Sequence, residues 1–522
     1  MEQRLDHRQH QKIVLGVLLF LIAAALFNTG TAISGFVPKH LAAGYEILDI
    51  HHISENHLSK QFPGYLSFLS SVFLVLNVDP LTPLHLPLQL VPYVTALFVL
   101  LHIITNGNLM IPGLVSGLHV LLPSTSSRRM HLLPHGLGDI LFFTLLILIL
   151  LLMRERSERR LFPLSVVCAL SLVYISYNKT AVSLLLLTAI YFVLKLTDYL
   201  DGFIERSDSL ERGNTATTIL LLTILLGINT LHSNFFYYRF IPVLIGGFQG
   251  GEAIMRVLYT WLESGSVEAE AISHLLITRP PSLTYIAALR YVIIFTGIAT
   301  VGTYILYKVR SARKLTVIEL FIPAYLGAIL VYLILRMFVS SFTVSWFYLP
   351  GVLVMAYLYS YLDSRKVRLG MVILFVLLAG TIVGTQIENN RHEAIDRNVD
   401  VAYEMERVYE WHSRYAPLDK APLADEHTRN VMMYRSMITH RTDSYHEATR
   451  TYGLLRVSQA AGLTTETDPG DDQYYILNNY QRTMSLQKWR IIQSWDNYEG
   501  AIHRNTHTNK IYSEGELWIF AS

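Results

Sequence analysis

Residues 138–153 read GDILFFTLLILILLLM, and the basic stretch RERSERR follows at residues 154–160. A run this apolar is typical of a membrane-crossing helix, and the cations directly after it indicate a cytoplasmic end under the positive-inside rule. The whole chain fits this class, because 52% of its 522 residues are hydrophobic and only 16% are charged, whereas soluble domains carry about 25% charge. The composition excludes a disordered chain and argues against a fully soluble enzyme.

Similar apolar segments recur along the chain and predict a polytopic membrane protein. The first follows the cations Arg4, Arg8 and Lys12 and is too long for a signal peptide, so we expect a membrane helix with a cytoplasmic N-terminus. Twelve segments qualify by composition: 13–36, 62–78, 84–106, 108–122, 138–153, 161–176, 179–196, 216–232, 284–307, 316–338, 343–362 and 367–385.

Charge predicts the topology of these segments. Basic clusters at 154–160, 308–314 and 365–368, with a mixed-charge stretch at 195–212, are expected inside the cell, which requires an odd number of spans. The segment 108–122 is short and contains Pro112, so we interpret it as re-entrant or interfacial. Eleven transmembrane helices remain.

The last quarter of the chain has a different composition. Residues 1–385 hold 27 Lys+Arg against 20 Asp+Glu, whereas residues 386–522 hold 15 against 20. We therefore predict an α-helical polytopic membrane domain over 1–385 and a small external α+β domain over 386–522. A helix is expected at 401–415, a strand at 474–477 and a hairpin over 510–520 with Gly515 at its turn.

The first predicted external segment, residues 37–61, is rich in groups that can carry chemistry. A carboxylate at a membrane surface can act as general base toward an acceptor hydroxyl; the alternative is a solvated interfacial loop. A metal site from His51, Glu55 and His57 matches no common ligand spacing. Within twelve positions the segment holds Glu46, Asp49, His51, His52, Glu55 and His57.

Cations near predicted outer ends of spans are candidates for binding a lipid-linked phosphate. A guanidinium suits this task because it binds phosphate bidentately, and an arginine within a span is costly unless it has a partner. Head-group anchoring, snorkelling or pairing with a carboxylate are the alternatives. The candidates are Arg128, Arg129, Lys179 and Arg336, with Asp139 expected nearby at the membrane interface.

The layout resembles the GT-C class of membrane glycosyltransferases, archaeal type. The resemblance rests on Asp49 in EILDIHH after the first span and on Phe62-Pro63-Gly64-Tyr65 at the second. It also rests on the run from RRMHLLPHGLGDI at residue 128 and on the ending NKIYSEGELWIF. One departure is the absence of a DxD pair in the first loop, which argues against an oligosaccharyltransferase role.

The resemblance implies transfer of a sugar from a polyprenyl (dolichyl) phosphate donor to a glycan, lipid or protein acceptor at the outer face of the cell membrane. Asp49 would be the base, with Glu46 as the fallback, and His52 would line the site. Arg128, Arg129, Lys179 and Arg336 would hold the donor phosphate. No cofactor follows from the residues, although a divalent cation stays open, and no nucleic-acid partner is expected. The alternatives are a lipid-linked polysaccharide polymerase or ligase, a transporter, and a non-catalytic scaffold.

Overall fold

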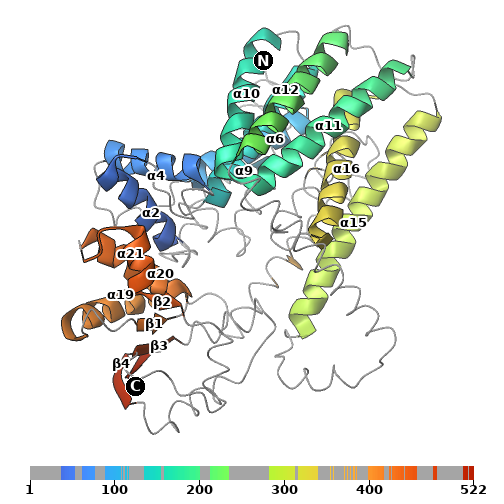
Figure 1. Cartoon of the computed structure of the whole chain (residues 1–522). Coiled ribbons are helices and arrows are strands. Elements are labelled where there is room, and N and C mark those ends of the chain that lie inside the picture. Colours follow the sequence, from blue (N-terminus) through green and yellow to red (C-terminus); the bar gives the residue numbers. More distant parts are fainter. Residues whose placement is uncertain are drawn as a thin grey trace, which may run out of the picture.

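A computed structural model gives the arrangement of the chain (Figure 1). It describes residues 37–52, 62–76, 89–106, 134–154, 158–199, 212–233, 281–311, 315–338, 398–416, 422–424, 426–439, 441–454, 474–478, 509–514 and 517–521, and isolated positions between 109 and 384.

The described part of the chain is mostly helical. Its longer helices before residue 340 are α2 (Val37–Ile50), α4 (Pro63–Leu76), α6 (Leu90–Ile104), α9 (Pro134–Arg154), α10 (Glu158–Ile175), α11 (Tyr177–Tyr199), α12 (Arg212–His232), α15 (Pro281–Arg310) and α16 (Val317–Phe338). Three helices follow near the C-terminus: α19 (Asn398–Tyr415), α20 (Glu426–Ile438) and α21 (Tyr445–Thr451).

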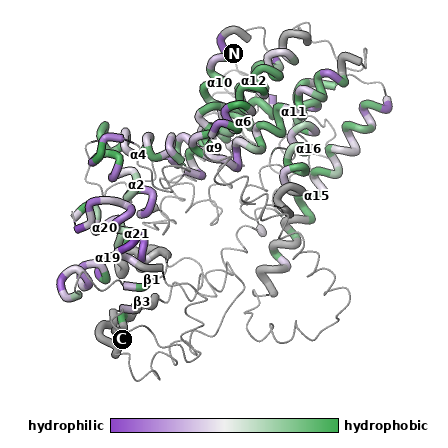
Figure 2. Tube along the Cα trace, in the orientation of Figure 1, coloured by the Kyte–Doolittle hydropathy of each residue, from purple (hydrophilic) through white to green (hydrophobic). Residues whose placement is uncertain are grey.

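Four of the described helices are long and apolar enough to cross a membrane, over residues Pro134–Arg154, Tyr177–Leu196, Thr215–His232 and Val292–Arg310. Shorter apolar helical stretches lie in α4, α6, α10 and α16. Figure 2 shows apolar residues along most of α9 to α12, whereas α19 and α20 are largely polar. The other predicted spans, including 13–36, fall on residues outside the described part or are represented only by isolated positions.

One hydrophobic core joins α6, α9, α10, α11, α12 and α16. Its interior is aliphatic and aromatic, with Phe142, Leu146 and Ile149 of α9 completely buried. The outward surface of α12 and α15 is apolar as well: Ile224, Ile228, Leu289 and other large side chains are exposed there. A helix that is apolar on both its buried and its exposed side fits a lipid environment.

A second core joins two segments that are far apart in sequence. It combines α2 and α4 with α19, α20, α21 and the C-terminal strands. Leu41 and Ala42 of α2 share this core with Met432 and Met433 of α20, and all four are fully buried. In Figure 1 these elements lie together, apart from α15 and α16.

The C-terminal segment also contains a five-stranded sheet in the order β2-β1-β3-β5-β4. Its strands are β1 (Pro422–Ala424), β2 (Gly453–Leu454), β3 (Tyr474–Asn478), β4 (Asn509–Glu514) and β5 (Leu517–Ala521). β1 pairs in parallel with β2 and β3, whereas β5 pairs antiparallel with β3 and β4. Its last two strands, β4 and β5, cover the stretch 510–520 that was expected to form a hairpin and extend one residue beyond it at each end; Gly515 lies outside the described residues.

The two segments after the first predicted span contain short helices. The first half of the predicted external segment 37–61 is helix α2, whose apolar positions Leu41, Ala42 and Ala43 pack into the second core. Helix α4 begins at Pro63 and supplies 14 residues of the predicted span 62–78, of which 77 and 78 lie outside the described residues. These 14 residues extend about 21 Å at 1.5 Å per residue, so a full crossing of the roughly 30 Å hydrocarbon core stays a prediction.

Candidate functional site

The two carboxylates of α2 have different surroundings. Glu46 is buried, and its Oε1 accepts a hydrogen bond of 2.9 Å from the backbone N–H of Tyr445. Tyr445 is the first residue of α21, where backbone N–H groups have no partner within the helix. Asp49, one turn later, is exposed. Of the two proposed bases, Asp49 is therefore the one whose carboxylate is open to a substrate.

The turn after α2 holds an unusual backbone conformation. His51 has a φ of 57°, in the left-handed region that non-glycine residues seldom occupy. His52 Nδ1 lies 2.8 Å from the carbonyl oxygen of Ile50. Because a carbonyl only accepts, Nδ1 carries the proton of this contact, and in a neutral ring the lone pair is then on Nε2. Both histidines are exposed beside Asp49.

The sequence Phe62-Pro63-Gly64-Tyr65 fixes α4 against its neighbours. The ring of Phe62 stacks on that of Tyr177, with centroids 6.2 Å apart. A Cβ on Gly64 would lie 2.9 Å from the Cβ of Tyr174, so only glycine permits this approach of α4 to α10. The sequence marked this motif as the start of a helix, but the packing roles of Phe62 and Gly64 depend on residues more than one hundred positions away.

Tyr65, the last residue of the motif, packs against a buried histidine of α2. Its ring meets that of His40 edge to face at 5.6 Å, and both side chains are buried. Burial, followed by the charges of Lys39 and His135, holds the pKa of His40 well below its ordinary value. His40 is therefore neutral at physiological pH.

A buried ion pair joins α9 to α11. The ammonium of Lys179 contacts Oδ1 of Asp139, and it also lies 5.5 Å from the ring centroid of Phe142. Both charged side chains are almost completely buried. Asp139 is enclosed between helices, where a paired charge is far less costly than a single one; its place at the membrane interface stays a prediction.

The same region brings α16 into contact with α11. Tyr332 donates a hydrogen bond of 3.2 Å to Oδ1 of Asn178, which is buried next to Lys179. Helix α9 also approaches the start of α11 closely, because a Cβ on Gly138 would lie 2.5 Å from the Cβ of Ser176. Polar groups from α9, α11 and α16 thus form one buried layer.

The remaining predicted site residues are not placed by the structure. Arg128 and Arg129 lie outside the described residues, as do Glu55 and His57. Arg336 belongs to α16, but its side chain is outside the described part. No group of three or more metal-binding side chains occurs among the residues that the structure describes.

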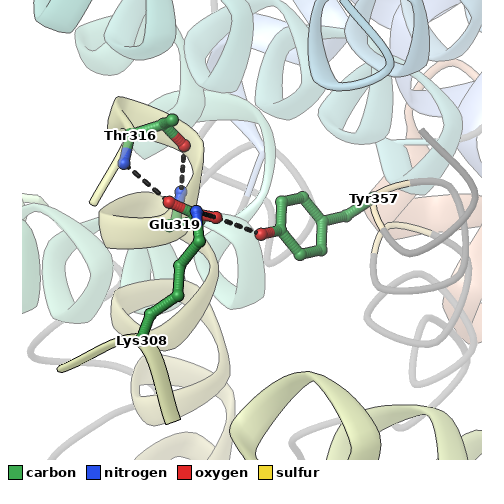
Figure 3. A network of polar contacts seen from close by, with 4 residues as sticks. All are labelled: Lys308, Thr316, Glu319 and Tyr357. Carbon is green, nitrogen blue, oxygen red and sulfur yellow. Dashed lines mark hydrogen bonds and ion pairs between the residues drawn. The ribbon is translucent and has the colours of Figure 1, made fainter. Parts of the chain in front are cut away.

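Sequence reasoning missed a second buried network, drawn in Figure 3. The carboxylate of Glu319 accepts hydrogen bonds from Lys308 Nζ at 2.5 Å, Tyr357 Oη at 2.6 Å and the backbone N–H of Thr316 at 2.7 Å. The backbone N–H of Glu319 in turn points to Thr316 Oγ1 at 3.4 Å. This is a capping box, and the pattern Thr-x-x-Glu before an apolar run was a readable signal for it.

Comparison with known proteins adds no family: no family model and no curated protein matches the chain.

Proposed function

We propose that this protein is a membrane glycosyltransferase that uses a polyprenyl-phosphate-linked sugar, with Asp49 as its general base. The single observation that supports it most is the position of Asp49. Its carboxylate is exposed in the last turn of α2, a helix packed on one side against α4 and on the other against α20. A base must be held in place to act on an acceptor hydroxyl, and this packing supplies a rigid support.

The neighbouring turn supports the same assignment. His51 is held at a positive φ next to Asp49, and such backbone outliers cluster at active sites and ligand-binding segments. The hydrogen bond from His52 to Ile50 orients its ring, so Nε2 can accept from a sugar or acceptor hydroxyl. Asp49, His51 and His52 would then form the exposed face of the site.

The proposed reaction is an inverting displacement. The acceptor oxygen attacks the anomeric carbon while Asp49 takes its proton, and the bond from that carbon to the phosphate oxygen breaks with its electrons leaving on the phosphate. Cations must stabilise that leaving group. Lys179 is already paired with Asp139, so the proposal assigns the phosphate chiefly to Arg128, Arg129 and Arg336.

The proposed topology has eleven spans and the C-terminal segment outside the cell. The four long apolar helices support membrane insertion, and the contact of α20 with α2 would place both on the same side. The exposed His446 of α21 offers a test. In a Cys168→Ser background, His446→Cys should react with an impermeant maleimide in intact cells; reaction only after lysis would reverse the topology.

The catalytic test uses a strain from which the gene is deleted and measures its surface glycans by mass spectrometry. The wild-type chain should restore the lost glycan, whereas Asp49→Asn, expressed at the same level, should reduce transfer by about 10²–10⁴-fold. Glu410→Gln, an exposed carboxylate on α19, is the matched control. Full restoration by Asp49→Asn would remove the proposed base and favour a polymerase, ligase, transporter or scaffold.

A further inference from the structure

The turn between α20 and α21 gathers hydroxyl groups that lie outside the proposed catalytic residues. Ser436 Oγ and Thr442 Oγ1 are 2.9 Å apart, and Tyr409 Oη and Thr439 Oγ1 are 2.5 Å apart. The backbone N–H of Arg441 donates to the carbonyl oxygen of Ser436 at 2.8 Å, which folds the turn back onto α20. Three elements, α19, α20 and the turn, therefore meet here.

Two arginines flank these hydroxyls. Arg441 is half-buried, and its Nη2 donates to the carbonyl oxygen of Ser413 at the end of α19. Its Nη1 is buried and has no hydrogen-bond acceptor among the residues that the structure describes. Arg435, also half-buried, comes from the last turn of α20. A buried guanidinium donor without an acceptor is costly, and a bound anion would supply that acceptor.

Nearby acidic groups do not neutralise Arg441. Asp443 and Glu447 are exposed, and the Glu447 carboxylate accepts instead from the backbone N–H of Asp443 at 2.7 Å. Burial raises the pKa of Tyr409, although the Thr439 hydrogen bond and the charges of Arg441 and Arg435 oppose it. Burial, followed by the nearby Tyr409, raises the pKa of Tyr452 to about 12. The hydroxyl of Ser436 and the charge of Arg441 act in the opposite direction. Both phenols are therefore neutral, so among the residues that the structure describes they bring no negative charge to Arg441.

We propose that Arg435 and Arg441 form a binding site for a phosphate group. Guanidinium groups approaching from two places, the last turn of α20 and the turn after it, match the several acceptor oxygens of a phosphate. This site goes beyond the proposed transfer reaction and does not depend on Asp49. The phosphate can belong to a soluble phosphorylated sugar or to a lipid head group; both present the same oxyanion.

The position of the turn gives the site a connection to α2. The turn leads directly into α21, whose first N–H is held by Glu46. Arg441 and Asp49 are thus carried by elements that contact each other, α2 and the α20–α21 segment. A ligand bound at the arginines would lie on the same packed unit as the proposed base.

The test measures binding of inorganic phosphate to the full-length protein in nanodiscs of neutral phosphatidylcholine, by calorimetry at constant ionic strength. We expect saturable binding that weakens at least tenfold in Arg435→Gln and in Arg441→Gln. Arg450→Gln, an exposed arginine on α21, is the matched control and should bind as the wild type does. Arg441→Lys keeps the charge without the planar fork and should recover part of the affinity.

Several outcomes would overturn the proposal. These are the absence of saturable phosphate binding, equal weakening by Arg450→Gln, and unchanged affinity in Arg435→Gln, a variant that leaves the contact between Arg441 and Ser413 intact. Nanodiscs containing anionic phosphatidylglycerol identify the source of the ligand. If phosphatidylglycerol competes with phosphate in the wild type, the ligand is a head group; if it does not, the ligand is soluble. An Asp49→Asn protein should bind phosphate normally, which separates this site from the proposed catalysis.

Discussion

Glu46 and Tyr445 are 399 positions apart in the chain, yet the Glu46 carboxylate accepts a 2.9 Å hydrogen bond from the Tyr445 backbone N–H. The bond gives one of the unpaired N–H groups of α21 a charged acceptor, in the place where the helix dipole favours negative charge. Ser444 completes the start of this helix, because its side chain accepts from the N–H of Glu447. The helix therefore begins on a partner supplied by the other end of the chain.

Replacing Glu46 should loosen this attachment. Hydrogen bonds to charged groups contribute about 1.5–3 kcal/mol, so Glu46→Ala should lower the free energy of unfolding by that amount and speed hydrogen exchange at the Tyr445 amide. Glu46→Gln retains a carbonyl acceptor and should have a smaller effect. Glu410→Gln is the control. If the Tyr445 amide exchanges as fast in Glu410→Gln as in Glu46→Ala, the hydrogen bond to Glu46 does not protect that amide.

The Asp139–Lys179 pair should show strong coupling. Removing one partner leaves a buried charge alone, so Asp139→Leu or Lys179→Met should each cost about 3–5 kcal/mol of unfolding free energy. The double variant removes both charges and should be more stable than either single variant. Thermal unfolding of the four proteins in one detergent gives the coupling energy. Additive losses would mean that the two charges do not stabilise each other.

Gly138 should tolerate no side chain. The new methyl of Gly138→Ala would lie 2.5 Å from the Cβ of Ser176, and such overpacking costs about 1–3 kcal/mol. Gly302→Ala is the matched control, since no atom lies within 4 Å of a Cβ placed there. It should be neutral, or stabilising by up to about 1 kcal/mol, because alanine favours helix. Equal melting temperatures for both variants would contradict the close approach of α9 to Ser176.

Stability should fall in mild acid because of His40. Its pKa in the folded protein is well below the ordinary value of 6.5, owing to burial, Lys39 and His135. Below pH 6.5 the unfolded chain therefore binds a proton that the folded chain does not, and stability decreases as the pH falls toward the folded pKa. The slope contributed by His40 reaches about 1.4 kcal/mol per pH unit. His40→Gln should flatten the profile between pH 7.5 and 5, whereas exposed His446→Gln should not.

How far the sequence predicts this molecule depends on whether a feature is local. The helices α9, α11 and α12 were readable because an apolar run long enough to cross a bilayer needs no knowledge of its neighbours. The pairing of Asp139 with Lys179 was not readable, since it depends on how α9 and α11 pack against each other in space, with α10 between them in the sequence. The same holds for Glu46, which looked like a second candidate base but is committed to Tyr445.

The core shared by α2, α4 and the C-terminal elements has a consequence for biosynthesis. The apolar face of α2 packs against Met432 and Met433, which are synthesised almost four hundred residues later. At roughly 5–20 residues per second, about 20–80 s pass between the synthesis of the two surfaces. During that time α2 must remain unaggregated with its partner missing, so a chain truncated before α20 should be a substrate for quality-control proteases even when every preceding membrane helix is complete.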